Sequence, residues 1–245
     1  MKVAVRAVAA WSSGLETDAD WERWAHNPTP LAGDELPKLP DVPPMLRRRC
    51  SALTKAMLAA AFRAAPPECR GSARTVFSSR HGAIHLAVRV IDTIYANRPV
   101  SPLQFSHSVH NAAAGQFSQI TGNRAASSSI AGGSASFGAA FLEALLFLER
   151  DPQTPVLLVH GDEPVPPLFL PLVDEPEARY AVALLLGGEG ASPVEFELAP
   201  ISAVGGEAHK WPEAIEFVRW WHAGSGPLTL GSAPQGFRFR RVARR

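Results

Sequence analysis

One stretch of the sequence combines the residue types and the setting that nucleophilic chemistry requires. The segment 125–138 reads Ala-Ala-Ser-Ser-Ser-Ile-Ala-Gly-Gly-Ser-Ala-Ser-Phe-Gly, which predicts a short strand, a turn and the start of a helix. The first N–H groups of a helix have no partner within it, so they and the helix dipole stabilise negative charge placed there. One hypothesis is therefore a serine hydrolase or acyltransferase, with a serine from Ser127–Ser129 or Ser134 as nucleophile and His110 or His160 as base.

The two cysteines lie in poorer settings for a nucleophile. Cys50 falls on the apolar stripe of a predicted helix, and Cys69 lies in a loop. Neither position follows a strand and opens a helix, which is where a thiol pKa would be lowered. We therefore expect no thiol chemistry from these residues.

Motifs for cofactors and metals are incomplete. Gly187-Gly188-Glu189-Gly190 follows a predicted strand but lacks the third spaced glycine of a dinucleotide-binding loop. His107 and His110 could act as a ligand pair, yet no third ligand accompanies them. Gly132–Ser136 lacks the final glycine of a nucleophile elbow. We expect neither a cofactor nor a metal.

Composition narrows the class of protein further. The chain has 245 residues, 46% of them hydrophobic, and a formal net charge of +1. These values exclude general disorder and give no reason to expect nucleic acid as a partner. No apolar run reaches the roughly 18 residues of a membrane span. Two cysteines and an N-terminus without the apolar core of a signal peptide favour a cytoplasmic protein.

The elements that must position these residues alternate between strands and helices. Strands are predicted at 3–10, 74–79, 125–130, 156–159 and 181–186, and helices at 45–65, 83–96, 112–120 and 134–149. The central strands are apolar without clear alternation, which is typical of sheets covered on both faces. The sequence therefore predicts an α/β domain with a mainly parallel five-stranded sheet between helices.

The C-terminal part reads as a small addition to this domain. Residues 191–245 predict an edge strand at 194–198, a helix with three tryptophans at 210–222, and a basic tail at 237–245 with five arginines. We expect all of residues 1–245 to form a single domain.

Several motifs, in one order along the chain, resemble the N-terminal half of the β-ketoacyl synthases, which belong to the thiolase-like superfamily. The resemblance covers about residues 1–190 and rests on the turn at 10–15, the arginine-led helix at 47–61, the segment 101–115, the strand-turn-helix junction at 125–138, and Gly161-Asp162-Glu163. Arg80-His81-Gly82 and the run 108–115 are similar to short members from bacterial aryl polyene pigment biosynthesis, the chain length factors.

The resemblance implies a partner subunit without catalysis of its own. In the family the nucleophilic cysteine stands eight residues before a small residue of the following helix. Counting back from Gly138 reaches Ile130, which has no nucleophilic atom. The catalytic histidines belong to the second half of the family's fold, for which we expect no room in 245 residues.

The same resemblance suggests which residues face a partner. It places Ser127, Ser128, Ser129 and Ile130 at the interface with a ketosynthase subunit in a heterodimer. It places these residues near the acyl tunnel: Phe105, Ser106, His107, Asn111 and Phe137. An acyl carrier protein would be a transient partner.

Other interpretations stay open at this point. Phe137 lies on a helical apolar stripe and is as well explained by core packing. The run Arg47-Arg48-Arg49 could attract an acidic carrier protein or could simply be a solvated surface. The chain could also be a homodimeric acyl-binding module or scaffold, and an isolated chain could pair with itself through the interface strand.

Overall fold

The computed structural model describes residues 1–173, 178–187, 192–200, 210–232 and 235–242, to which all structural statements refer. The elements, in chain order, are β1 (Lys2–Ser12), α1 (Asp18–His26), α2 (Pro44–Arg49), α3 (Ala52–Ala64), α4 (Pro67–Arg70), β2 (Arg74–Ser78), α5 (Ile84–Tyr95), α6 (Pro102–Ser108), α7 (Ala112–Thr121), β3 (Ser127–Ile130), the 3₁₀ turn η1 (Gly133–Ala135), α8 (Ser136–Arg150), β4 (Val156–Asp162), the 3₁₀ segment η2 (Pro167–Leu172), β5 (Tyr180–Leu186), β6 (Ser192–Pro200), α9 (Glu213–Ala223), β7 (Leu228–Ser232) and β8 (Gln235–Arg241).

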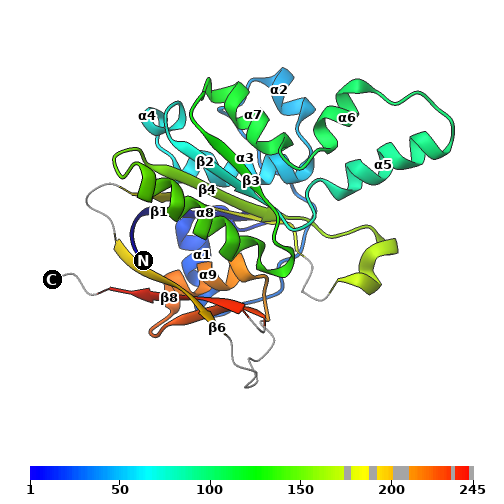
Figure 1. The fold of residues 1–245 in the computed structure, drawn as a ribbon. Helices are drawn as coiled ribbons and strands as arrows, with labels where there is room; N and C mark the ends of the chain where they lie inside the picture. Colours follow the sequence, from blue (N-terminus) through cyan, green and yellow to red (C-terminus); the bar gives the residue numbers. More distant parts are fainter. Residues whose placement is uncertain (174–177, 188–191, 201–209, 233–234, 243–245) are drawn as a thin grey trace.

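The strands form one sheet in the order β3-β2-β4-β5-β1-β6-β8-β7. Figure 1 shows it running through the middle of the molecule. The predicted α/β class is confirmed, and so is the mainly parallel arrangement of the five predicted strands, because β1, β2, β3 and β4 run in one direction and β5 runs opposite. Strand β5 lies between β4 and β1 and is therefore antiparallel to both neighbours, and the C-terminal strands β6, β7 and β8 add further antiparallel pairs. The apolar runs in β4 and β5 reflect helices on both faces, which bury a strand whatever its direction.

The C-terminal addition extends the sheet instead of lying beside it. The strand predicted at an edge is β6, which is hydrogen-bonded to β1 on one side and β8 on the other. Most of the predicted basic tail is β8, which pairs with β6 and β7; residues 243–245 lie outside the described part. Arg238 and Arg240 point outward and form ion pairs with Glu197 and Glu195 of β6. A pattern of alternating arginine and phenylalanine therefore marks a strand with one buried face.

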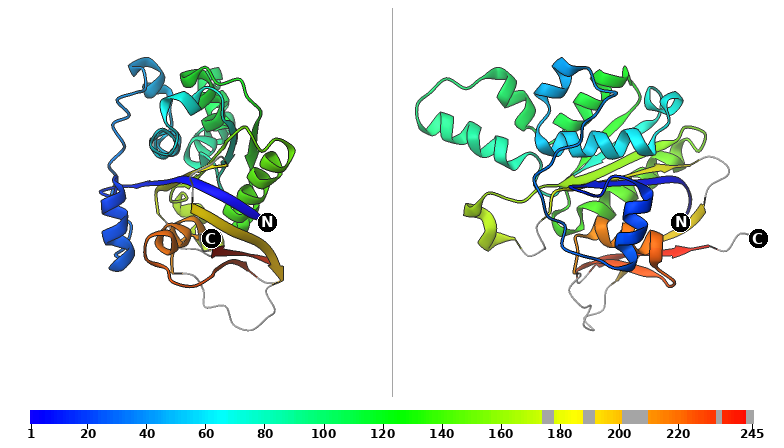
Figure 2. Two further views of the ribbon diagram at one scale, coloured as in Figure 1. Left: turned by 90° about the vertical axis from the view of Figure 1, so that its left-hand side faces the viewer. Right: turned by 180° about the vertical axis from the view of Figure 1, so that it is seen from behind.

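Helices cover the sheet from two sides and create two cores. On one side, α3 packs on β4, β5 and β1, and α7 packs on β2 and β3. On the other side, α8 packs on β2, β3 and β4, with α9 and α1 beside it (Figures 1 and 2). The curved end of the sheet packs on α8, because Phe196 stacks on Phe141 of that helix and Phe239 contacts the same ring edge-on. Helix α8 thereby packs against two parts of one sheet.

Helices α5 and α6 project from the body as an arm (Figures 1 and 2). Val90 is the one fully buried residue of α5, although the helix is strongly apolar. Ile91, Ile94 and Tyr95 are exposed, as are Leu103 and Phe105 of α6. An apolar helix pair with this little cover is typical of a surface that meets another protein. Among the described helices, none combines the length and apolar character needed to cross a bilayer.

Candidate functional site

The junction between β3 and α8 lies where the sequence predicted it. Ile130 ends β3, η1 follows, and α8 begins at Ser136. Gly133 has φ 61°, a left-handed conformation that glycine adopts without strain. The Ser136 hydroxyl closes the turn, since it accepts the Gly132 N–H at 3.0 Å and donates to the Gly133 carbonyl at 2.7 Å. The turn is rigid, and its side chains offer hydroxyls but no thiol.

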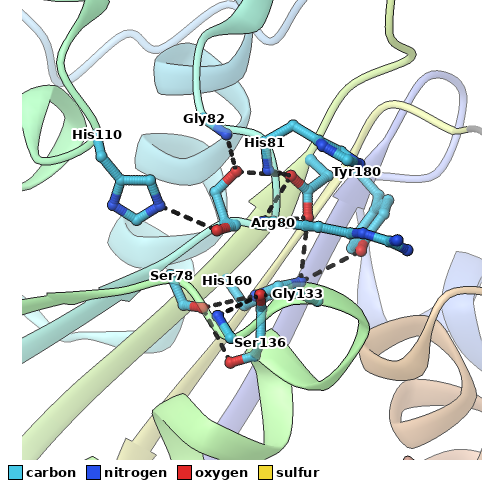
Figure 3. Close-up of polar contacts among 12 residues, drawn as sticks. Ser78, Arg80, His81, Gly82, His110, Gly133, Ser136, His160 and Tyr180 are labelled. Atoms are coloured by element: carbon cyan, nitrogen blue, oxygen red, sulfur yellow. Dashed lines mark hydrogen bonds and ion pairs between the residues drawn. The ribbon is translucent and has the colours of Figure 1, made fainter. Parts of the chain in front are cut away.

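A buried histidine links this turn to the central strands (Figure 3). His160 of β4 places Nδ1 3.1 Å from Ser78 Oγ and Nε2 3.2 Å from the Tyr180 hydroxyl, and Ser78 Oγ donates to the Ser136 carbonyl at 3.0 Å. The Ser78 proton is used in that last bond, so His160 Nδ1 donates to Ser78 Oγ. The other ring nitrogen, Nε2, lies between the Tyr180 hydroxyl and Asp162 Oδ2, which is 3.5 Å away.

Asp162, two residues further along β4, fixes the loop after β2. Its carboxylate accepts Ser79 Oγ–H at 2.6 Å and the backbone N–H groups of Arg80 and His81 at 3.0 and 3.1 Å. Ser79 Oγ also accepts the Gly82 N–H at 2.7 Å, while the Ser79 carbonyl lies 2.9 Å from His110 Nε2. A carboxylate that accepts this many N–H and O–H groups holds a loop in one conformation.

Sequence reasoning missed this polar network. It ended the strand at Val159, but β4 continues through Asp162. The strand seemed to end because polar residues follow an apolar run. The signal that could have corrected this is Tyr180 opening the next strand, which supplies a hydroxyl partner for a buried histidine.

The space at this site is small. A hollow of about 10 Å³ lies at the start of α8, which is room for roughly one water molecule. Six of its lining residues come from four places in the chain: Gly133, Ser134, Phe137, His160, Tyr180 and Glu213. An acyl chain does not fit within this hollow.

The buried histidine leads to a prediction for stability against pH. Burial lowers the pKa of His160, with His110 acting in the same direction and Asp162 opposing them. The folded chain keeps His160 neutral, whereas the unfolded chain binds a proton below about pH 6.5. We therefore expect full stability above that pH and a decline as the pH falls below it, at up to about 1.4 kcal/mol per pH unit for one proton. Urea denaturation at pH 7.5, 6.5 and 5.5 measures the change.

The matched variant is His160→Gln, which removes the titrating ring but can still form hydrogen bonds. We expect it to be less stable than the parent at pH 7.5 and to depend less on pH below 6.5. Burial also lowers the pKa of His222, so the comparison is made in a His222→Gln background as well. An unchanged pH dependence in both His160→Gln chains would contradict the assignment.

Two serines and both histidines of the hydrolase hypothesis have other partners, and no described hydrogen bond joins Ser134 to His160, although both line the hollow at the start of α8. Ser127 Oγ accepts from Thr75 Oγ1 at 2.8 Å, and Ser128 Oγ donates to Glu143 at 2.7 Å. His110 contacts a backbone carbonyl and His160 contacts Ser78. Ser78 is 1% exposed, so no substrate reaches that pair. The described contacts therefore give the hydrolase hypothesis no support.

The residues predicted near a tunnel do not form one cluster in this chain. Phe105 and Ser106 are exposed on α6, and His107 Nδ1 lies 2.7 Å from the Arg49 carbonyl. Asn111 is exposed just before α7. Phe137 is 1% exposed and packs against His160, Phe217 and Phe239, so its position is that of a core residue.

Both cysteines are buried away from the β3–α8 junction. Cys50 separates α2 from α3, because Ser51 caps α3 by accepting the Thr54 N–H at 3.0 Å; the single helix predicted at 45–65 is therefore two. Burial raises the pKa of the Cys50 thiol, which makes it a poor nucleophile at neutral pH. Cys69 is buried in α4. In the described part of the chain, no three His, Cys, Asp or Glu side chains gather to hold a metal ion.

The sheet covered by helices, with α8 packed on β2, β3 and β4 and starting after the end of β3, defines a thiolase-like fold of the ketosynthase type. The family model for the N-terminal domain of β-ketoacyl synthases matches residues 21–235. The chain belongs to this family.

Solved structures agree on the fold. A chain from the complex of ketosynthase ApeO with its chain length factor ApeC, from Xenorhabdus doucetiae, superposes with a TM-score of 0.83 at 23% identity, covering 98% of this chain and 100% of its own. The ishigamide ketosynthase/chain length factor superposes with a TM-score of 0.64 at 17% identity, covering 81% of this chain and 68% of its own. A chain from the AntDE:AntF complex of a ketosynthase with its acyl carrier protein superposes with a TM-score of 0.63 at 14% identity, covering 82% of this chain and 70% of its own. A search of curated proteins found no match.

Proposed function

We propose that this chain is a noncatalytic, chain-length-factor-like subunit that pairs with a ketosynthase in the cytoplasm and shapes its acyl tunnel during elongation of a polyene or fatty-acyl chain. The observation that carries the proposal is the end of β3. There the strand presents an outer edge and ends at Ile130, and the turn that follows contains no cysteine.

The chemistry of condensation supports a role without catalysis. A condensing enzyme carries its acyl chain as a thioester on a thiolate. Ile130 has only an alkyl side chain, and the two cysteines are buried elsewhere. The hollow at the start of α8 is too small for an acyl chain. A tunnel that this subunit helps to form would therefore lie at its boundary with a partner.

The outer edge of β3 is suited to pairing with a second strand. Thr75 N–H donates to the Ala126 carbonyl at 3.0 Å, and Ser79 N–H donates to the Ile130 carbonyl at 3.4 Å. In a parallel pair this places the backbone groups of alternate residues toward β2, so those of Ser127 and Ser129 point outward. β3 is the terminal strand of the sheet, and unpaired edge groups recruit another chain.

The projecting arm supports an extended interface. Phe105 is 58% exposed and Tyr95 is 90% exposed, and both lie on helices that extend beyond the sheet (Figure 2). A partner that pairs with β3 would also meet α6. Phe105 and Ser106 would then contribute to the wall of the partner's tunnel, with His107 and Asn111 behind them.

Co-expression tests the pairing. We expect the chain to co-purify with the ketosynthase of its own gene neighbourhood and to elute from size exclusion as a heterodimer. Separate elution of the two proteins at micromolar concentration would contradict the proposal.

The open edge of β3 also favours a second candidate, a homodimer that acts as an acyl-binding module or scaffold. The same backbone groups would pair across a two-fold axis. Light scattering on the chain with and without the ketosynthase separates the two, because a homodimer that persists when the ketosynthase is in excess supports the second candidate.

A further inference from the structure

The arm formed by α5 and α6 joins the body at two places, residues 79–82 and 109–111, which we call its roots (Figure 2). Helix α5 packs on α6, and α6 packs on α7. Val90 is the one fully buried residue of α5, so few apolar contacts fix the direction of this helix. A segment with so little packing moves easily unless other bonds hold it. The direction of the arm therefore depends on its roots.

Asp162 of β4 holds the first root. Its carboxylate accepts Ser79 Oγ–H and the N–H groups of Arg80 and His81, all within 3.1 Å. Asp162 is 5% exposed and Ser79 is buried with it, so water does not compete for these bonds. The root ends at Gly82, whose φ of 63° suits glycine and whose N–H donates to Ser79 Oγ at 2.7 Å. One carboxylate thus organises the whole turn.

The same turn holds the second root as well. His110 Nε2 donates to the Ser79 carbonyl at 2.9 Å (Figure 3). The His110 ring also lies close to Gly82, since a methyl group on that glycine would stand 3.5 Å from His110 Cδ2. A third contact joins His85 Nε2 of α5 to the Pro164 carbonyl at 2.7 Å, just beyond the end of β4. Both roots are therefore anchored at this end of β4.

We propose that Asp162 is a positioning residue, which fixes the direction of the arm and thereby the place of Phe105 in the wall of a partner's tunnel; the role of Phe105 rests on the proposed function. Asp162 acts through Ser79, which contacts the carboxylate with its hydroxyl and His110 with its carbonyl. His110 follows α6, the helix that carries Phe105. Loss of the carboxylate removes the acceptor of three donors, which frees the turn and the arm with it.

The test measures the arm in the chain alone, which makes it independent of a ketosynthase. Spin labels at Tyr95→Cys on α5 and Glu149→Cys on α8, both exposed positions, report the distance between arm and body by pulsed electron spin resonance. Cys50 and Cys69 are buried, and labelling of the chain without added cysteines checks that they stay unmodified. We expect Asp162→Ala to widen the distance distribution about twofold, because local bonds hold the arm.

Two further variants make the result specific to the carboxylate. Asp162→Asn keeps an acceptor oxygen for Ser79 and the backbone N–H groups, so we expect it to restore most of the parent's narrow distribution. Ser79→Ala keeps the carboxylate but breaks its link to the root, so we expect it to widen the distribution. A parent-like distribution in Asp162→Ala, or in Ser79→Ala where Asp162→Ala does not fold, would overturn the inference.

The matched control is Glu216→Ala. Glu216 is 3% exposed, so its carboxylate is as buried as that of Asp162, but it lies on α9 and pairs with Arg219 at 2.9 Å. Helix α9 lies away from the arm in both views (Figures 1 and 2). We expect this variant to lower the melting temperature and to leave the distance distribution unchanged. Equal widening in Glu216→Ala and Asp162→Ala would overturn the assignment, since it would reflect lost stability alone.

Products made together with the ketosynthase test the link to Phe105. We expect Asp162→Ala to change the length of the acyl product, as Phe105→Ala should. If only Phe105→Ala changes the products, the link from Asp162 to Phe105 is overturned while the proposed function stands. If neither variant changes them, the proposed function is contradicted, and a widened distance distribution still supports Asp162 as the anchor of the arm.

Discussion

Replacing Ser129 with proline is expected to abolish the complex with the ketosynthase while the chain stays folded. The backbone N–H of Ser129 points away from β2, so a proline there removes no hydrogen bond within the sheet. It does remove an outward donor, and its ring blocks a neighbouring strand. We expect the affinity to fall by two orders of magnitude or more, which is about 2.7 kcal/mol. Analytical ultracentrifugation of the co-expressed pair measures it.

One further variant and one control measurement make this result specific. Ser129→Thr keeps the N–H and favours a strand, so we expect it to retain the complex. Circular dichroism must show that the proline variant melts within a few degrees of the parent. If the folded proline variant still binds the ketosynthase normally, the partner does not pair with β3.

Removing the Phe137 side chain is expected to have the largest effect on stability. The ring is 1% exposed and lies 5.3 Å from Phe217 and 5.7 Å from His160, measured between ring centres. It joins α8 to α9 and to β4, and no small residue can fill its place. Phe137→Ala should therefore cost about 3–5 kcal/mol, lowering the melting temperature by on the order of 10 °C. Urea and thermal denaturation measure both.

Phe105→Ala is the matched control, because Phe105 is 58% exposed on α6. We expect a change in stability within about 0.5 kcal/mol. In the complex, however, we expect this variant to alter the length of the acyl product, which core packing alone would not do. Equal destabilisation by the two substitutions would contradict the assignment of Phe137 to the core and of Phe105 to the surface.

Most local elements of this fold could be predicted from the sequence. The spacing of apolar residues over a short stretch of sequence is enough to predict a helix or a strand. It predicts the helix after Gly133, the strand at 74–78 and the helix α5. The break between α2 and α3 was missed because the apolar stripe continues through Cys50. There the hydrogen bond from the Thr54 N–H to the Ser51 hydroxyl outweighs continuity of the stripe.

Contacts between distant segments could not be read in the same way. The direction of β5 depends on where the chain returns after η2, which no local pattern encodes. One polar network joins Ser78, His160, Asp162 and Tyr180. Its first and last residues, Ser78 and Tyr180, are 102 positions apart in the sequence (180 − 78). The motifs placed the β3–α8 junction in the right position, but only the folded chain shows that a buried histidine supports it.

The most direct test of the central claim is an elongation assay with three samples: the ketosynthase alone, this chain alone, and the two together. Acyl products on the carrier protein are measured by mass spectrometry. We expect no product from this chain alone, and full-length product only when both proteins are present. Full-length product from the ketosynthase alone, or any condensation by this chain alone, would contradict it.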